Sequence, residues 1–232
     1  MAAKKKFSKI FVVTGPDASG KDVQIERLVN WLSKETRLKV STVRIWDTLE
    51  TFKDISDQKV LSQVIDAFLT QFTPEARSLF LSSALLNALQ KKMAETELLI
   101  VNGFIYKYWA SELAYGVNPS LWHQMAQCFP RPDSIFFLDV PLDVCLSRRE
   151  RWTNYESGGS GVNGSQRAVF QEKVHSKFAE TLKDAGHIYK INGNQEENQV
   201  FIELRRAFAT KLQSAFGHSS HIFRQEDFSA SL

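Results

Sequence analysis

The sequence lacks several of the features by which large classes of protein are recognised. Its 232 residues include two cysteines, Cys128 and Cys145, whose spacing is unlike that of a metal site. We therefore expect two reduced thiols, in or near the core of a cytoplasmic protein. No stretch approaches the apolar length needed to cross a membrane, and we find no internal repeat.

The sequence also lacks a large excess of positive or negative charge. The 29 basic and 26 acidic residues leave a net charge of +3, too close to balance to indicate binding to nucleic acid or to a membrane. The lysines at 4–6 precede a short apolar run that leads into a glycine-containing loop, so we interpret them as a solvated start rather than a targeting signal. His218 and His221 are three apart, and we expect a solvated tail there rather than a metal site.

The most informative segment is residues 10–22, IFVVTGPDASGKD. An apolar, β-branched run leads into Gly15, four further residues, and then Gly20 and Lys21, which is the pattern of a phosphate-binding loop between a strand and a helix. The glycines let backbone N–H groups point at a phosphate, the helix N-terminus adds partial positive charge, and Lys21 adds a full charge. An ordinary strand-to-helix turn would not explain a lysine at the unfavourable end of a helix dipole.

Asp22 departs from this pattern, which has Ser or Thr after the lysine to place a hydroxyl on Mg²⁺. A carboxylate can ligate Mg²⁺ directly, but it could also pair with Lys21 or repel a phosphate. We hypothesise that Asp22 is a metal ligand.

Strand and helix patterns alternate along the rest of the chain. Strands are predicted at about 9–14, 38–46, 98–101, 134–139 and 187–191, and helices at about 21–35, 57–71, 73–95, 105–116, 119–128, 141–152, 165–184 and 196–214. Five strands separated by helices predict an α/β fold, a doubly wound parallel sheet with helices on both faces. We expect one domain over residues 1–215 and a loose tail over 216–232.

A segment rich in Gly, Ser and Asn lies at about 152–166, between two of the predicted helices. We expect no fixed structure there, and we interpret it as a flexible lid that closes over phosphates and expels water; a plain linker loop is the alternative. Arg148, Arg149 and Arg151 stand just before it. They would either clamp phosphates or form a solvated helix end.

Four stretches of the sequence resemble the thymidylate kinase family, the P-loop kinases that phosphorylate dTMP with ATP. The resemblance covers about residues 7–210 and is carried by residues 15–24 (GPDASGKDVQ), by 101–104 with 111–115, by 132–148, and by 170–178 with 191–193. It implies the P-loop kinase fold and ATP-dependent transfer of a phosphoryl group to a nucleoside monophosphate, with dTMP the favoured acceptor. It also implies Mg²⁺ as a cofactor and a homodimer formed through helices at about 57–90.

The resemblance implies a role for individual residues. The ATP site would be formed by Gly15, Ala18, Ser19, Gly20, Lys21, Asp22, Val23 and Arg148, and the acceptor site by Asp17, Arg44, Asn102 and Tyr115. Asp17 would hold the sugar hydroxyl of the acceptor, and Arg44 would approach its phosphate. Catalysis would rest on Lys21 together with Arg149 and Arg151, because the loop lacks an arginine; Arg167 is a further candidate for that charge.

The sequence also departs from the family at the acceptor site. Asn102-Gly103 replaces an Asp-Arg pair, so Asp22 would stand in for the missing acid as well as for the missing hydroxyl. Leu81 and Leu85 replace the Phe and Arg that hold thymine. Trp46, Phe80, Tyr106, Lys107 and Trp109 would either build a different acceptor pocket or serve as ordinary packing residues. Two alternatives therefore stay open: a kinase for a different small acceptor, and a nucleotide-binding protein without catalysis.

Overall fold

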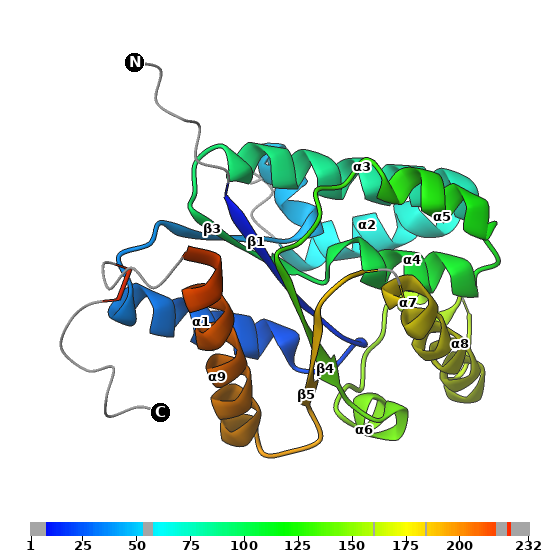
Figure 1. The fold of residues 1–232 in the computed structure, drawn as a ribbon. Coiled ribbons are helices and arrows are strands. Elements are labelled where there is room, and N and C mark those ends of the chain that lie inside the picture. The colour runs from blue at the N-terminus through cyan, green and yellow to red at the C-terminus, as the bar shows by residue number, and fades with distance from the viewer. Residues whose placement is uncertain (1–7, 53–57, 160, 184, 217–221, 224–232) are drawn as a thin grey trace.

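The computed structural model describes residues 8–52, 58–159, 161–183, 185–216 and 222–223. Its centre is a parallel sheet, as predicted, and its strand order is β2-β3-β1-β4-β5 (Figure 1). The strands are β1 (Lys9–Thr14), β2 (Val40–Val43), β3 (Leu98–Asn102), β4 (Ser134–Asp139) and β5 (Ile188–Asn192). The first strand lies in the middle of this sheet, so the loop that follows it opens at the centre of the carboxyl edge.

Helices connect the strands and cover both faces of the sheet. They are α1 (Lys21–Glu35), the 3₁₀ helix η1 (Ile45–Phe52), α2 (Gln58–Gln71), α3 (Pro74–Met93), α4 (Phe104–Ala114), α5 (Pro119–Ala126), α6 (Leu142–Ser147), α7 (Asn154–Ser157), α8 (Gly164–Leu182) and α9 (Glu197–Phe216). Thr73 caps α3 and Pro74 is its first residue, as expected. None of the described helices is both long and apolar enough to span a bilayer.

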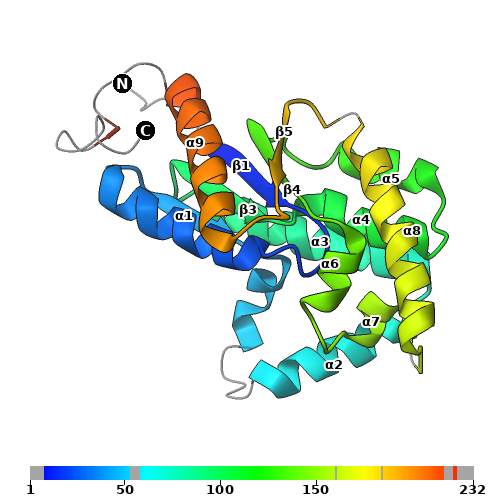
Figure 2. The same cartoon turned by 90° about the horizontal axis from the view of Figure 1, so that it is seen from below.

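The alternation of side chains along β1 divides the core into two parts. Phe11 and Val13 point to the face covered by α1 and α9, where Phe11 packs against the ring of Phe208 at 4.9 Å between centroids. Ile10 and Val12 point to the face covered by α3, α4 and α8. Figure 2 shows these two layers from a second direction. Burial on both faces explains the continuous apolar runs of the central strands.

Three local predictions are wrong. Ile45 and Trp46, expected at the end of a strand, begin η1, and Cys128 is exposed although Cys145 is buried. The helix expected over 141–152 ends at Ser147, as α6. A second helix, Asn154–Ser157, begins seven residues later with its own cap at Thr153.

That second helix, α7, lies in the segment expected to have no fixed structure. The Thr153 hydroxyl accepts a hydrogen bond from the Glu156 amide at 3.1 Å, and the Glu156 carboxylate accepts one from the Thr153 amide at 3.1 Å. Asn163 and Gln166 form the same reciprocal cap at the start of α8. The pattern T-x-x-E is a capping box and was visible in the sequence, but the Gly and Ser content around it favoured a loop.

Candidate active site

The loop between β1 and α1 is held close to the neighbouring strands. A Cβ atom on Gly15 would lie 2.8 Å from the Leu138 carbonyl oxygen of β4, so only glycine fits. Gly20 has a left-handed conformation, with φ 87°, at the N-cap of α1, and Ala18 is also left-handed, with φ 62°. The hydroxyl of Ser19 is buried and has no hydrogen-bond partner among the described residues. A tight loop with an unpaired buried donor fits an anion-binding site.

Lys21 is buried at the start of α1, with 6% of its surface exposed, and its ammonium donates to the Pro16 carbonyl oxygen at 2.9 Å. Burial, assisted by the nearby charge of Lys107, lowers the pKa of Lys21 to about 8. The carboxylates of Asp17 and Asp22 oppose this shift only in part. A buried ammonium with a lowered pKa is a strong binding partner for an anion.

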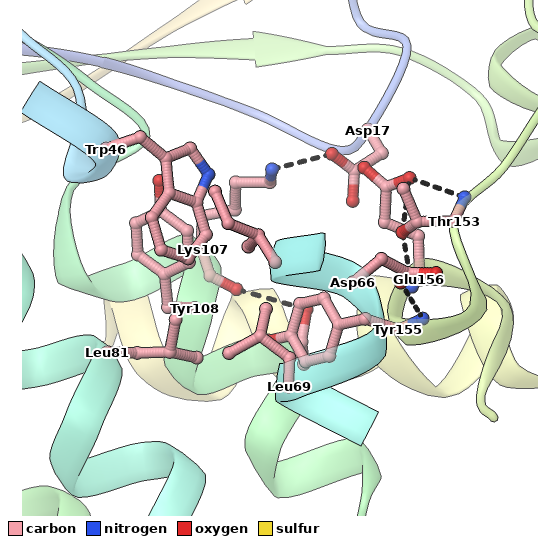
Figure 3. A pocket seen from close by; sticks show the side chains of 12 residues that line it. Asp17, Trp46, Asp66, Leu69, Leu81, Lys107, Tyr108, Thr153, Tyr155 and Glu156 are labelled. Carbon is pink, nitrogen blue, oxygen red and sulfur yellow. Dashed lines mark hydrogen bonds and ion pairs between the residues drawn. The ribbon is translucent and has the colours of Figure 1, made fainter. Parts of the chain in front are cut away.

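Asp17, inside the loop, faces Lys107 of α4. The Lys107 ammonium lies 2.7 Å from the Asp17 carboxylate, and the two side chains are 19% and 8% exposed (Figure 3). Burial opposes the ionisation of Asp17, but the charges of Lys107 and Lys21 outweigh it and lower the pKa of the carboxyl. The loop therefore carries an ionised carboxylate between two ammonium groups.

The ends of β1 and β3 bring Asp22 and Asn102 together. The Asn102 amide donates to the Asp22 carboxylate at 2.6 Å. The Thr14 hydroxyl donates to the Gly103 carbonyl oxygen at 2.9 Å, which fixes the end of β3 beside the loop. No cluster of three or more His, Cys, Asp or Glu side chains arranged for a metal is found in the described part of the chain. Mg²⁺ in phosphotransfer sites is commonly held by one or two carboxylates and the substrate phosphates, so a single Asp22 fits that ion.

The arginines before the lid occupy different positions. Arg149 pairs with Glu156 of α7 at 2.9 Å and is close enough to Asp17 to lower the pKa of that carboxyl. Arg148 is exposed and donates to the Gly193 carbonyl oxygen, at 3.1 Å, beyond the end of β5. Arg151 is exposed. The charge of Arg149 therefore acts on Asp17 of the phosphate-binding loop.

A cavity of about 220 Å³ opens beside the Asp17–Lys107 pair. Its lining combines apolar and polar side chains from the loop, η1, α2, α3, α4 and the lid: Asp17, Trp46, Ile65, Asp66, Leu69, Leu81, Lys107, Tyr108, Ser111, Thr153, Tyr155 and Glu156. In Figure 3, Trp46 and Tyr108 lie on one side, and Thr153 and Tyr155 on the other. This lining suits a ligand with an apolar planar part and a polar end that reaches the loop.

The helix α7, which lies in the segment expected to form a lid, is docked against α2 and α8. The Asp66 carboxylate of α2 accepts hydrogen bonds from the backbone amides of Asn154, at 3.1 Å, and Tyr155, at 3.0 Å. The Gln171 side chain of α8 donates to the Glu156 carbonyl oxygen at 2.6 Å. The structure therefore shows α7 in contact with the body of the protein, as Figure 2 also shows.

A buried polar cluster lies behind the lid. Arg77 of α3 pairs with Glu112 of α4 at 2.8 Å, with side chains 4% and 1% exposed, and the Tyr155 hydroxyl donates to Glu112 at 2.9 Å. Tyr115 stacks on Tyr155 and donates to its carbonyl oxygen at 2.6 Å. Burial raises the pKa of Glu112, against the opposing effect of Arg77. The cluster joins the lid to α3 and α4.

The structure brings many of the predicted site residues together. Those gathered at the loop are Gly15, Asp17, Ala18, Ser19, Gly20, Lys21, Asp22, Asn102 and Arg149. Val23 follows them on the first turn of α1. Arg44 is exposed and does not line the cavity, and Tyr115 lies behind Tyr155, so their substrate contacts stay predictions.

From the sequence, the role of some residues in the cavity was open, and other lining residues were not predicted. Trp46 and Lys107 line the cavity, whereas Tyr106 and Trp109 are buried in the core, and Phe80 packs against Phe68. Missed residues are Ile65, Asp66, Leu69, Tyr108, Thr153, Tyr155 and Glu156. For Thr153 and Glu156 the capping-box spacing was a usable signal. Asp66 and Leu69 lie on a helix distant in the sequence, where nothing local marks a site.

A glycine loop with a buried lysine, at the central strand of a parallel sheet, places the chain in the class of P-loop kinase folds. A family model described as thymidylate kinase matches residues 13–203, and the chain belongs to this family. It is similar to a thymidylate kinase of Caenorhabditis elegans, 26% identical over 86% of this chain and 89% of that protein. It is also similar to a probable thymidylate kinase 1 of Saccharolobus solfataricus, 22% identical over 83% of this chain and 92% of that one.

Removing the charge of Glu112 should destabilise the fold, because Arg77 would be left buried without a counter-charge. We expect Glu112→Leu to lower the free energy of unfolding by about 3–5 kcal/mol, measured by urea denaturation. The double variant Arg77→Leu/Glu112→Leu should recover part of this loss, and Glu75→Leu, at an exposed position of α3, should change little. A loss below about 1 kcal/mol in Glu112→Leu would show that the pair is not important for stability.

Proposed function

We propose that the protein transfers the γ-phosphoryl group of ATP to a nucleoside monophosphate, with dTMP the first candidate acceptor. The observation that carries this proposal is that the Asp17–Lys107 pair lines the cavity and is also close enough to Lys21 of the phosphate-binding loop for their charges to act on it. A donor phosphate on the loop and an acceptor in the cavity would meet at this point. Phosphoryl transfer needs mainly such positioning and the stabilisation of charge.

Each group of the site has a part in this reaction. The loop amides and Lys21 would bind the ATP phosphates, and Asp22 would hold Mg²⁺, which neutralises the charge of the phosphates when bound. Arg149 would approach the transferred group. Asp17 would hold the acceptor sugar hydroxyl. The docked lid would exclude water from the transfer, which limits hydrolysis of ATP.

The apolar residues that line the cavity affect which acceptor base can bind. Trp46 and Leu81 line the cavity and suit a flat base. The resemblance places the Phe that stacks on thymine near Leu81, so the contacts to the base would differ. This observation supports a second candidate, a kinase for another nucleoside monophosphate, built on the same loop and lid.

We also propose a homodimer formed through residues 57–90. On α2, Val64 and Phe68 are 58% and 47% exposed and lie one helical turn apart, and Leu79 of α3 is 46% exposed. Exposed apolar side chains on adjacent helices favour an interface. Sedimentation at micromolar concentration should give twice the chain mass, and a single-chain mass would exclude the dimer.

An acceptor screen tests the proposed function. We expect the purified protein to form ADP from Mg²⁺·ATP in the presence of dTMP, assayed beside dUMP, dCMP, UMP, AMP and GMP. Lys21→Met should lower kcat/KM by at least about 100-fold, because a cation aimed at developing charge is lost. Lys34→Met, at the exposed far end of α1, is the matched control. Turnover only with another monophosphate would select the second candidate, and ATP binding without turnover on any acceptor would refute the kinase.

The pKa of Lys21 predicts how ATP binding depends on pH. Between pH 7 and 9 the free ammonium, with a pKa of about 8, loses its proton, whereas a bound phosphate would keep it protonated. Binding should therefore take up a proton near pH 8.5, and affinity should be about tenfold weaker at pH 9 than at pH 7. Calorimetry in two buffers of different ionisation enthalpy measures both quantities. Lys21→Arg, which stays protonated, should bind without this dependence; a flat profile in the parent protein would contradict the assignment.

The metal role of Asp22 is tested by the Mg²⁺ dependence of ATP binding. Asp22→Ser restores the hydroxyl of the usual loop but removes the carboxylate, and we expect the apparent Mg²⁺ affinity to fall by about tenfold. Glu26→Ser, at an exposed position one turn further along α1, is the matched control. An unchanged Mg²⁺ affinity in Asp22→Ser would show that the carboxylate does not ligate the ion.

A further inference from the structure

The segment after β3 carries no charge in this chain. It reads Asn102-Gly103, and the Asn102 side chain is engaged with Asp22. An acceptor monophosphate brings two negative charges to this edge of the sheet, between the loop and the cavity. A cation beside this phosphate would stabilise it, and neither Asn102 nor Gly103 supplies one.

The absence of a side chain at Gly103 leaves room for the stem of such a cationic side chain. A Cβ atom on Gly103 would lie 3.3 Å from Cδ of Lys107 and 3.7 Å from its Cβ, so the lysine stem passes directly over the glycine. Lys107 lies one helical turn further along α4. Gly103 and Phe104 both have positive φ, 84° and 48°, and this sharp turn starts α4 beside the loop. A Cβ atom at position 103 would force the Lys107 stem to shift by a few tenths of an ångström, and the positive φ of Gly103 disfavours a side chain there in any case.

The ammonium of Lys107 is presented to the cavity. Lys107 lines the cavity, its side chain is 19% exposed, and its ion-pair partner among the described residues is Asp17. The ammonium also lies 5.5 Å from the ring centre of Tyr108. An ammonium has three N–H donors, so the contact with one Asp17 oxygen leaves donors for a ligand. Burial lowers the pKa of Lys107, but Asp17 outweighs this effect and raises it, so the group is charged at neutral pH.

We propose that Lys107 binds the phosphate of the acceptor and supplies the positive charge that Asn102-Gly103 lacks. Because Gly103 has no side chain, the stem of Lys107 can pass over it and reach the site. This inference rests on the proposed function, because it assumes a monophosphate in the cavity. The competing role is structural: Lys107 would only orient Asp17, which would hold the sugar. The two roles differ in one respect, since a phosphate-binding lysine distinguishes a nucleoside monophosphate from its nucleoside and a lysine that only orients Asp17 does not.

The test compares the affinities of dTMP and thymidine for the parent protein and for Lys107→Gln. We expect the affinity for dTMP to fall by about 10- to 100-fold, as for a lost charge-assisted hydrogen bond, and that for thymidine to change by less than about threefold. The acceptor KM should rise and the ATP KM should stay constant. Lys107→Arg, which keeps the charge, should retain most of the preference for the monophosphate. Lys173→Gln, at an exposed position of α8, is the matched control, and urea midpoints check that each variant folds.

Each other outcome has a definite meaning. An equal loss for dTMP and thymidine would show that Lys107 only orients Asp17, and an unchanged preference for dTMP would show that it does not reach the phosphate. Either result overturns the inference while the proposed function stands. If the acceptor screen selects another monophosphate, that compound and its nucleoside replace dTMP and thymidine. If the parent protein binds none of the monophosphates, the proposed function fails and this inference fails with it.

Discussion

The site depends on how closely the loop after β1 is held against the ends of its neighbouring strands. Gly15 approaches the Leu138 carbonyl oxygen at a distance that no larger residue allows, and Thr14 is bonded to Gly103. These contacts fix the start of α1, so that Lys21 is buried beside the loop backbone. They also fix the start of α4, so that Lys107 reaches Asp17. One corner of the sheet thereby positions groups from both halves of the proposed reaction.

Most charged groups of this corner already have partners within the protein. Lys107 is paired with Asp17, Arg149 with Glu156, and the Lys21 ammonium donates to a carbonyl oxygen. Buried charges without partners are costly, so pairing keeps the site folded. An incoming phosphate has to compete with these acceptors, and a ligand with several negative charges does so better than a weak anion. The same pairing connects the lid to the reaction, because Glu156 belongs to α7.

Much of the fold could be predicted because its signals are local. The buried strands are continuous apolar runs, and the loop residues 15–22 are contiguous, so both follow from short segments of sequence. The lid could not be judged from composition, since the T-x-x-E cap at Thr153 outweighs the surrounding glycines. The cavity could not be predicted from the sequence, because Leu69, Leu81 and Tyr155 come from three helices that meet only in the folded chain. Lys107 was a candidate for the acceptor pocket, but the sequence could not predict that it pairs with Asp17 or that its stem passes over Gly103.

The central claim is that the loop amides and Lys21 hold the phosphates of a nucleotide. Hydrogen exchange of the backbone amides, followed by mass spectrometry on peptides covering residues 14–24, tests it most directly. With a saturating, non-hydrolysable ATP analogue and Mg²⁺, the account predicts slower exchange in these peptides and little change in peptides from α9. Unchanged exchange at residues 14–24, with the analogue shown to be bound or with no binding at all, would contradict it.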